Sequence, residues 1–131
     1  RRVTMLGAAF KPETDDIRDS PAMAVAELLW AAGADVVIHD PKAGANVRAV
    51  YPHLQVRDSI AMAVDGAELV VVGTEWRDYA QADSALLGSL VKNKLVIDGR
   101  NVLPHRDWQA EGWKVIALGR NLDNSRVTVE A

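Results

Sequence analysis

The sequence contains no cysteine among its 131 residues. This absence excludes disulfide bonds, thiolate zinc sites and a cysteine nucleophile within the chain, and it is typical of a reducing compartment, so we expect a cytoplasmic protein. No apolar run approaches the roughly 18 residues of a membrane-spanning helix, so no membrane partner is expected. Positive charge is not in surplus either, because 15 basic residues stand against 18 acidic ones, and we expect no nucleic-acid partner.

Aromatic residues are scarce at 5%, while apolar residues reach 49% and charged residues 25%. This balance is typical of a globular domain whose core is built from aliphatic side chains and alanine. The chain begins with Arg1-Arg2-Val3, without Met and directly on an expected strand. We therefore expect it to be part of a longer protein.

Five short aliphatic runs, at residues 3–7, 34–40, 68–73, 94–99 and 113–118, are separated by helical or polar stretches. The runs are continuously apolar rather than alternating, which is typical of strands buried on both faces of a parallel sheet. The pattern predicts an α/β fold over residues 1–118, a doubly wound, mainly parallel Rossmann-like sheet flanked by helices. Residues 119–131 lack an apolar pattern, and we expect them to form a flexible tail.

The most clearly marked helix follows Ser20, a capping residue, with Pro21 at its first position and Gly33 after its end. Its expected apolar stripe consists of Ala22, Val25, Ala26 and Leu29. Further helices are expected over residues 58–64, 82–90 and 104–111, with a short one within 41–51. Trp30, Trp108 and Trp113 fall in these helix and strand patterns and are interpreted as packing residues.

In such sheets ligands bind outside the carboxyl ends of the strands, so the loop at residues 7–20 is the first candidate. It lacks the G-x-G-x-x-G turn of dinucleotide folds and is about twice the usual length of such a loop. Lys11 and Arg18 give it two cations beside the helix start at Ser20, an arrangement suited to phosphates. Alternatively, Arg18 pairs with Asp15, Asp16 or Asp19 in a solvated loop.

Two further loops at this edge carry polar side chains. Arg100, in Asp98-Gly99-Arg100-Asn101, could bind a phosphate or sugar oxygen with two parallel hydrogen bonds, or it could pair with Asp98 or Glu75. Trp76, in Thr74-Glu75-Trp76, is interpreted as a lid on the core, although it could also shield a ligand.

Other polar residues carry less chemistry. Asp40 ends the second expected strand, where dinucleotide folds bind a ribose, but without the glycine turn a turn or capping role before Pro41 is favoured. His39, His53 and His105 share no helical face or ligand spacing, so no metal site is expected.

Residues 7–21 read GAAFKPETDDIRDSP. This segment resembles the G-x-x-F-K-x-x-T-D-D-x-R-x-S-P signature that opens the C-terminal domain of UDP-glucose/GDP-mannose dehydrogenases. The likeness continues through Thr74-Glu75-Trp76 and residues 97–101 to residues 112–120, and covers all but the tail. Phe-Lys-Pro followed by Thr-Asp-Asp is most similar to the UDP-glucose 6-dehydrogenase branch.

The resemblance implies a UDP-sugar-binding domain of an NAD-dependent dehydrogenase that oxidises UDP-glucose to UDP-glucuronate. By motif, Phe10, Lys11 and Arg100 would contact the UDP-sugar, Arg18 would reach the NAD phosphates, and Asp15 and Asp16 would orient the loop. NAD would be held mainly by an N-terminal domain outside this chain, and the parent enzyme would be a homodimer or larger.

The family's nucleophilic cysteine, general base and NAD glycine turn lie upstream of this domain. We therefore expect no catalytic residue in this chain and no activity from it alone. Within the family, the substrate could instead be GDP-mannose or a UDP-N-acetylhexosamine. A stand-alone nucleotide sensor is an alternative from another class. A phospho-acceptor receiver domain is another, but it needs a lysine where Arg100 stands and fits poorly.

Overall fold

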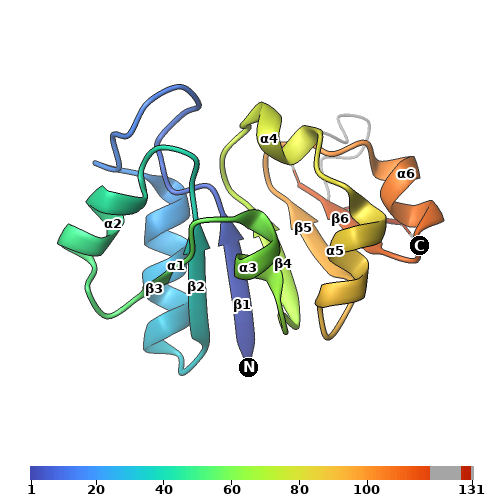
Figure 1. Cartoon of the computed structure of the whole chain (residues 1–131), viewed down its shortest axis with the longest axis horizontal. Helices are drawn as coiled ribbons and strands as arrows, with labels where there is room; N and C mark the ends of the chain where they lie inside the picture. Colours follow the sequence, from blue (N-terminus) through green and yellow to red (C-terminus); the bar gives the residue numbers. More distant parts are fainter. Residues whose placement is uncertain (119–127, 131) are drawn as a thin grey trace.

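The computed structural model describes residues 1–118 and 128–130. Their strands form one seven-stranded sheet in the order β3-β2-β1-β4-β5-β6-β7 (Figure 1). Six strands run parallel, namely β1 (Arg2–Leu6), β2 (Asp35–His39), β3 (Gln55–Val56), β4 (Leu69–Val72), β5 (Leu95–Asp98) and β6 (Lys114–Ala117). The seventh, β7 (Thr128–Glu130), pairs antiparallel with β6 at the edge.

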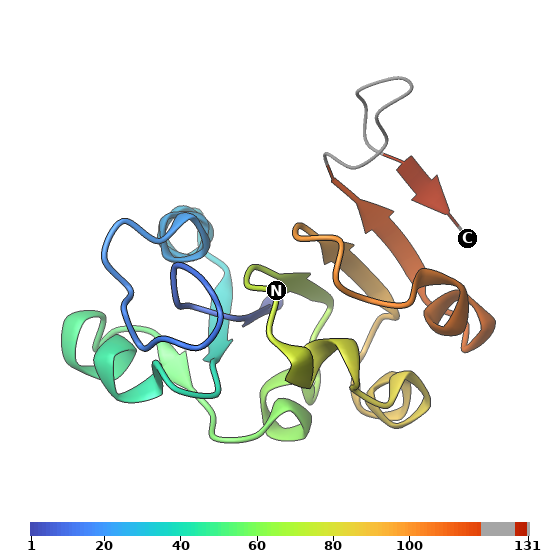
Figure 2. The same ribbon diagram turned by 90° about the horizontal axis from the view of Figure 1, so that it is seen from above.

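Helices cover the sheet unevenly (Figure 2). On one face, α1 (Pro21–Ala31) and α2 (Gly44–Val50) pack over β1, β2 and β3. On the other face lie α3 (Ile60–Val64), α4 (Arg77–Ala80), α5 (Ser84–Leu90) and α6 (His105–Ala110). The strand order reverses direction between β1 and β4, so the predicted doubly wound, mainly parallel fold is confirmed.

Three of the described helices, α1, α3 and α5, begin at a residue whose side chain caps them. Ser20 accepts a hydrogen bond from the Met23 N–H at 3.3 Å, with Pro21 at the first helical position as predicted. Ser59 caps α3 in the same way, accepting from the Met62 N–H at 3.0 Å. The Ser20 cap fixes the start of α1 directly after the long loop that follows β1.

The expectation that every strand is buried on both faces is only partly correct. β1 and β2 are buried on both faces after their first residue, because helices lie above and below them. In β4, Val70 and Val72 are fully buried, whereas Leu69 and Val71, on the opposite face, are half-buried. None of the described helices lies over this second face of β4, β5 and β6 (Figure 2).

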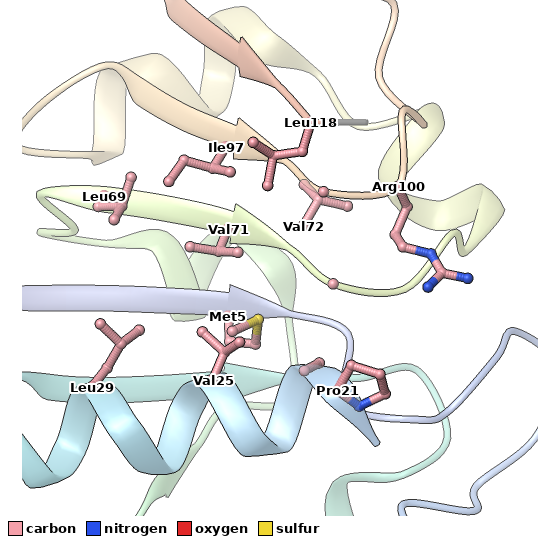
Figure 3. Close-up of a pocket in the computed structure, with 13 residues that line it drawn as sticks. Met5, Pro21, Val25, Leu29, Leu69, Val71, Val72, Ile97, Arg100 and Leu118 are labelled. Atoms are coloured by element: carbon pink, nitrogen blue, oxygen red, sulfur yellow. The ribbon is translucent and has the colours of Figure 1, made fainter. Parts of the chain in front are cut away.

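The uncovered face forms one wall of an open apolar groove of about 400 Å³ (Figure 3). Val71 and Ile97 line it from the sheet, and Val25 and Leu29 line it from the flank of α1. This location explains why Val25, from the predicted apolar stripe, is 42% exposed while Ala22 and Ala26 are buried. Arg100 stands at the end of the groove where the strands finish (Figure 3).

Two sequence expectations need correction. Trp108 and Trp113 are core residues, but Trp30 is 47% exposed and contacts the His53 ring on the surface in a tilted arrangement, with ring centres 4.4 Å apart. Residues 128–130 of the expected tail form β7 rather than a flexible segment, and the rest of that tail lies outside the described residues. Within the described ranges, no helix has the length and apolar character to cross a membrane.

Candidate functional site

The loops after β1, β2, β4 and β5 all leave the sheet at its carboxyl edge, beside the switch point between β1 and β4 (Figure 1). Each sequence-predicted site residue lies in one of these loops. The chain therefore brings the candidate residues to one edge of the sheet, the edge where α/β sheets bind ligands.

Asp40 fixes the base of the first loop. Its carboxylate Oδ2 accepts from the Ala8 and Ala9 N–H groups at 2.8 and 2.9 Å, and Oδ1 accepts from the N–H groups of Lys42 and Ala43. Of the turn or capping role predicted for Asp40, the structure shows the turn, because the N-cap of α2 is Ala43. The Ala8 and Ala9 N–H groups, which a dinucleotide fold would turn toward a pyrophosphate, point at this carboxylate instead.

Gly7 leaves β1 with a φ of +100°, a conformation that favours glycine. A Cβ atom at this position would lie 2.6 Å from the Thr74 side chain. Thr74 is fully buried, and its hydroxyl donates to the Ala9 carbonyl oxygen at 2.8 Å. The first loop is therefore joined closely to the loop after β4.

A hydrogen bond within the first loop joins its two sides. The Phe10 N–H donates to the Asp16 carbonyl oxygen at 2.9 Å, and Ile17 is buried in the core under α1. Phe10 is 52% exposed, and Lys11 is exposed with no hydrogen bond or ion pair to any other described residue. The loop thus presents an aromatic ring and a free ammonium group to solvent from a fixed frame.

Arg18 is paired within its own loop. Its guanidinium donates to both Asp16 carboxylate oxygens, with Nε 3.0 Å from Oδ1 and Nη2 2.9 Å from Oδ2. The hydrogen bonds from Arg18 lower the pKa of the Asp16 carboxyl to about 2, and the same contact raises the pKa of Arg18. The pair lies at the surface, with 87% of the Arg18 side chain exposed.

The loop after β5 is wrapped around Asp98, a fully buried carboxylate. Asp98 accepts from the N–H groups of Arg100, Val102 and Leu103, and His105 Nε2 lies 2.8 Å from its Oδ2. Asn101, between these donors, adopts a left-handed φ of +58°, which asparagine tolerates better than most residues. The organising role of Asp98 was not predicted from the sequence, although an aspartate at a strand end before Gly-Arg-Asn was the available signal.

Arg100 pairs with Glu75, one of the two partners left open by the sequence. The Glu75 Oε1 atom accepts from Arg100 Nε at 3.1 Å and from Nη2 at 2.6 Å. About a third of the Arg100 side chain stays exposed, with its guanidinium beyond the strand ends (Figure 3). Trp76, next to Glu75, is 2% exposed, so its predicted role as a core lid is correct.

A buried pair beneath the edge was missed by the sequence analysis. The Tyr79 hydroxyl donates to the His39 carbonyl oxygen at 3.0 Å and lies 3.0 Å from His39 Nδ1. Burial lowers the pKa of His39 and raises the pKa of Tyr79. His39 is 5% exposed and Tyr79 fully buried, so we interpret the pair as packing beneath the edge.

Among the described residues, the edge has no cluster of three histidine, aspartate or glutamate side chains that could hold a metal. Its exposed groups include the unpaired ammonium of Lys11, two guanidinium groups each held by a carboxylate, the Lys42 ammonium 3.7 Å from Glu13, and an aromatic ring. Such groups recognise phosphates and flat polar rings through charge-assisted hydrogen bonds and stacking.

Comparison with known proteins agrees with this chemistry. Residues 4–105 match the family model described as the UDP-glucose/GDP-mannose dehydrogenase family, UDP binding domain. A UDP-glucose 6-dehydrogenase of Pseudomonas aeruginosa is 40% identical over 126 residues, which cover 92% of this chain and 28% of that protein.

Two solved structures share the fold. The UDP-glucose dehydrogenase of Pyrobaculum islandicum matches with a TM-score of 0.70 and 38% identity, over 82% of this chain and 23% of that one. An NDP-N-acetyl-D-galactosaminuronic acid dehydrogenase of Methanosarcina mazei matches with a TM-score of 0.77 and 29% identity, over 88% of this chain and 24% of that one.

The chain spans about a quarter of the length of the curated relatives it matches. The matched family region includes the three loops that carry Lys11, Glu75 and Arg100. By sequence and by fold, this chain belongs to the UDP-glucose/GDP-mannose dehydrogenase family, as its UDP binding domain.

Proposed function

We propose that this domain binds the diphosphate of a UDP-sugar between the Lys11 loop and the Arg100 loop, with Phe10 against the ligand. The observation that carries the proposal is the convergence of these loops at one sheet edge, inside the region that matches a UDP binding domain. A diphosphate is recognised well by an ammonium and a guanidinium together, because both donate charge-assisted hydrogen bonds.

The parent enzyme, on this proposal, is an NAD-dependent UDP-glucose 6-dehydrogenase that forms UDP-glucuronate and assembles as a homodimer or larger. The cofactor would accept hydride from the sugar. The residues of this chain do not fit a complete NAD site, because the Ala8 and Ala9 N–H groups are bound to Asp40. Arg18, at the surface, is the residue we assign to the cofactor phosphates, and the rest of the NAD site would lie on another domain.

Titration of the isolated chain with UDP, followed by amide chemical shifts, tests the binding site. Losing one charge-assisted contact to a phosphate costs roughly 1.5–3 kcal/mol, so Lys11→Ala or Arg100→Ala should weaken binding about tenfold or more. Lys92→Ala is the matched control, because it removes an exposed lysine just before β5, at the opposite edge. Shifts that cluster at that opposite edge would overturn the proposal.

Kinetic measurements on the full-length protein that carries this domain test whether Arg18 contacts NAD and Lys11 contacts the sugar nucleotide. Arg18→Ala should raise the apparent KM for NAD more than the KM for the sugar nucleotide, and Lys11→Ala should do the reverse. NADH formation followed by absorbance measures both. Equal increases in both KM values would mean that Arg18 only stabilises the loop. The isolated chain should form no NADH, and activity from it would contradict the assignment.

Comparing UDP-glucose with GDP-mannose and UDP-N-acetylhexosamines in the full-length protein identifies the sugar nucleotide. The matched Methanosarcina mazei protein, named for a different sugar, makes this comparison necessary. Highest kcat/KM with UDP-glucose is the expected result.

A further inference from the structure

The backbone of Arg100 is fixed, but its side chain needs a separate restraint. Asp98 accepts the Arg100 N–H at 3.3 Å and binds the N–H groups of Val102 and Leu103, so the loop has little freedom. An arginine side chain has four rotatable bonds, and ordering it costs more rotamer entropy than ordering a short side chain. A guanidinium already held in one orientation binds an anion without that cost.

Glu75 supplies the restraint through one side of the guanidinium. A single carboxylate oxygen, Oε1, accepts from both Nε and Nη2 of Arg100. A guanidinium has five N–H donors, and this contact uses one from each of these nitrogens. Nη1 has no bonded partner among the described residues, so the Nη1–Nη2 side remains open, with the spacing that binds two phosphate oxygens.

Glu75 is itself held in place by its two neighbours. Thr74 is fully buried and donates to the Ala9 carbonyl oxygen, while the Trp76 indole N–H donates to Asp40 Oδ2 at 3.2 Å. Between them, Glu75 is exposed at the sheet edge. The three consecutive residues therefore contact three different loops. Thr74 contacts the loop after β1, Trp76 contacts the loop after β2, and Glu75 contacts the loop that carries Arg100.

We propose that Glu75 is a positioning residue for the nucleotide, holding Arg100 side-on so that its outer edge faces the diphosphate. This inference rests on the proposed function, since it concerns the same site. The opposing hypothesis makes Glu75 a competitor that occupies Arg100 until a phosphate displaces it. The side-on contact favours positioning, because it leaves free the edge of the guanidinium that two phosphate oxygens need.

A double-mutant cycle with the isolated chain and UDP separates these hypotheses. Glu75→Ala should weaken UDP binding about three- to tenfold, because the Arg100 side chain must then be ordered by the ligand. Glu75→Gln, which keeps an acceptor oxygen, should bind within about twofold of the unsubstituted chain. In an Arg100→Ala background, Glu75→Ala should have no further effect, and uridine without phosphates should bind equally to all variants.

Each other outcome has a distinct meaning. Tighter UDP binding by Glu75→Ala would overturn positioning in favour of competition. An equal loss in the Arg100→Ala background would reduce Glu75 to a structural residue, which thermal melting of the variants checks independently. UDP binding that Glu75→Ala leaves unchanged overturns this inference alone. An unsubstituted chain that binds no UDP overturns the proposed function itself.

Discussion

Two buried carboxylates organise the two halves of the functional edge in different ways. Asp40, after β2, is 7% exposed and accepts five hydrogen bonds from three separate segments of the chain. Asp98, the last residue of β5, is fully buried, and the donors to its carboxylate all lie within the next seven residues. Asp40 therefore joins distant loops, whereas Asp98 shapes a single loop.

The difference shows that the same residue type at the same place in a strand–loop unit can serve folding or binding. Each aspartate directly follows or ends an aliphatic strand, so the local sequence is alike. What differs is where the donors come from. Asp40 connects loops that are distant in sequence, because its donors come from three segments. Asp98 fixes the loop that carries Arg100, because its donors all lie in that loop.

Asp40→Ala should have the largest effect on stability. The buried N–H groups of Ala8, Ala9 and Ala43, the buried Trp76 indole and the partly buried Lys42 N–H lose their acceptor, so the free energy of unfolding should fall by about 3–5 kcal/mol. Urea unfolding measures the loss. Amide shifts should change at Ala8, Ala9, Ala43 and Trp76 together. A loss below about 1 kcal/mol would mean that water replaces the carboxylate, and the contrast with Asp98 would disappear.

Asp98→Ala should lower the free energy of unfolding less than Asp40→Ala does, but it should weaken UDP binding more. Its Arg100 and Val102 donors are only partly buried and can turn to water, so we expect a loss of about 2–3 kcal/mol. UDP affinity should fall at least as far as in Arg100→Ala, because the loop that carries Arg100 loses its shape. Shift changes should stay within residues 99–105. Changes spreading across the sheet would contradict the local role.

His39, next to Asp40, should make stability depend on pH. Burial lowers its pKa in the folded state, so the unfolded chain takes up a proton first as the pH falls. The free energy of unfolding should therefore decrease as the pH falls below the ordinary histidine value of about 6.5. Urea unfolding at several pH values tests this, and His39→Gln should reduce the dependence. If the free energy of unfolding of His39→Gln depended on pH as steeply as that of the unsubstituted chain, another group would cause the dependence.

The smallest effect should come from Asp16, a surface carboxylate that contrasts with both buried ones. Its pKa is lowered to about 2 by Arg18, so the pair stabilises the fold above the ordinary value of 3.8 and stops doing so as the pH falls toward 2. NMR titration of the Asp16 carboxyl carbon should give a midpoint near 2. Arg18→Ala should return it toward the ordinary value, and no return would place the cause outside this pair.

The sequence predicts the fold well because its signals are local. The aliphatic runs became β1, β2, β4, β5 and β6, and Ser20-Pro21 begins α1 as expected. β3 has only two residues, too short to carry a pattern, and β7 lies in a segment without an apolar run. The expectation that β4 is buried on both faces was wrong. Burial depends on which helices pack over a strand, and the apolar run of that strand does not encode this.

The candidate site was predicted as a set of loops but not as a set of contacts. Lys11, Arg18 and Arg100 lie at the expected edge. The partners of both arginines were left open by the sequence, and the fold selects Asp16 and Glu75. Glu75 and Arg100 are 25 residues apart in the chain and meet only because β4 pairs with β5, which spacing alone does not reveal.

The central place of β1 has a consequence for how the chain acquires its structure. Among the strands of this domain β1 comes first in the chain, yet its two neighbours come much later, since Val3 pairs with Val36 on one side and with Leu69 on the other. Contacts so distant in sequence form slowly, because a long loop must close before they contribute any stabilisation. During translation, one edge of β1 therefore remains without a partner until β4 has left the ribosome, and this interval is when the nascent chain is most exposed to misassociation.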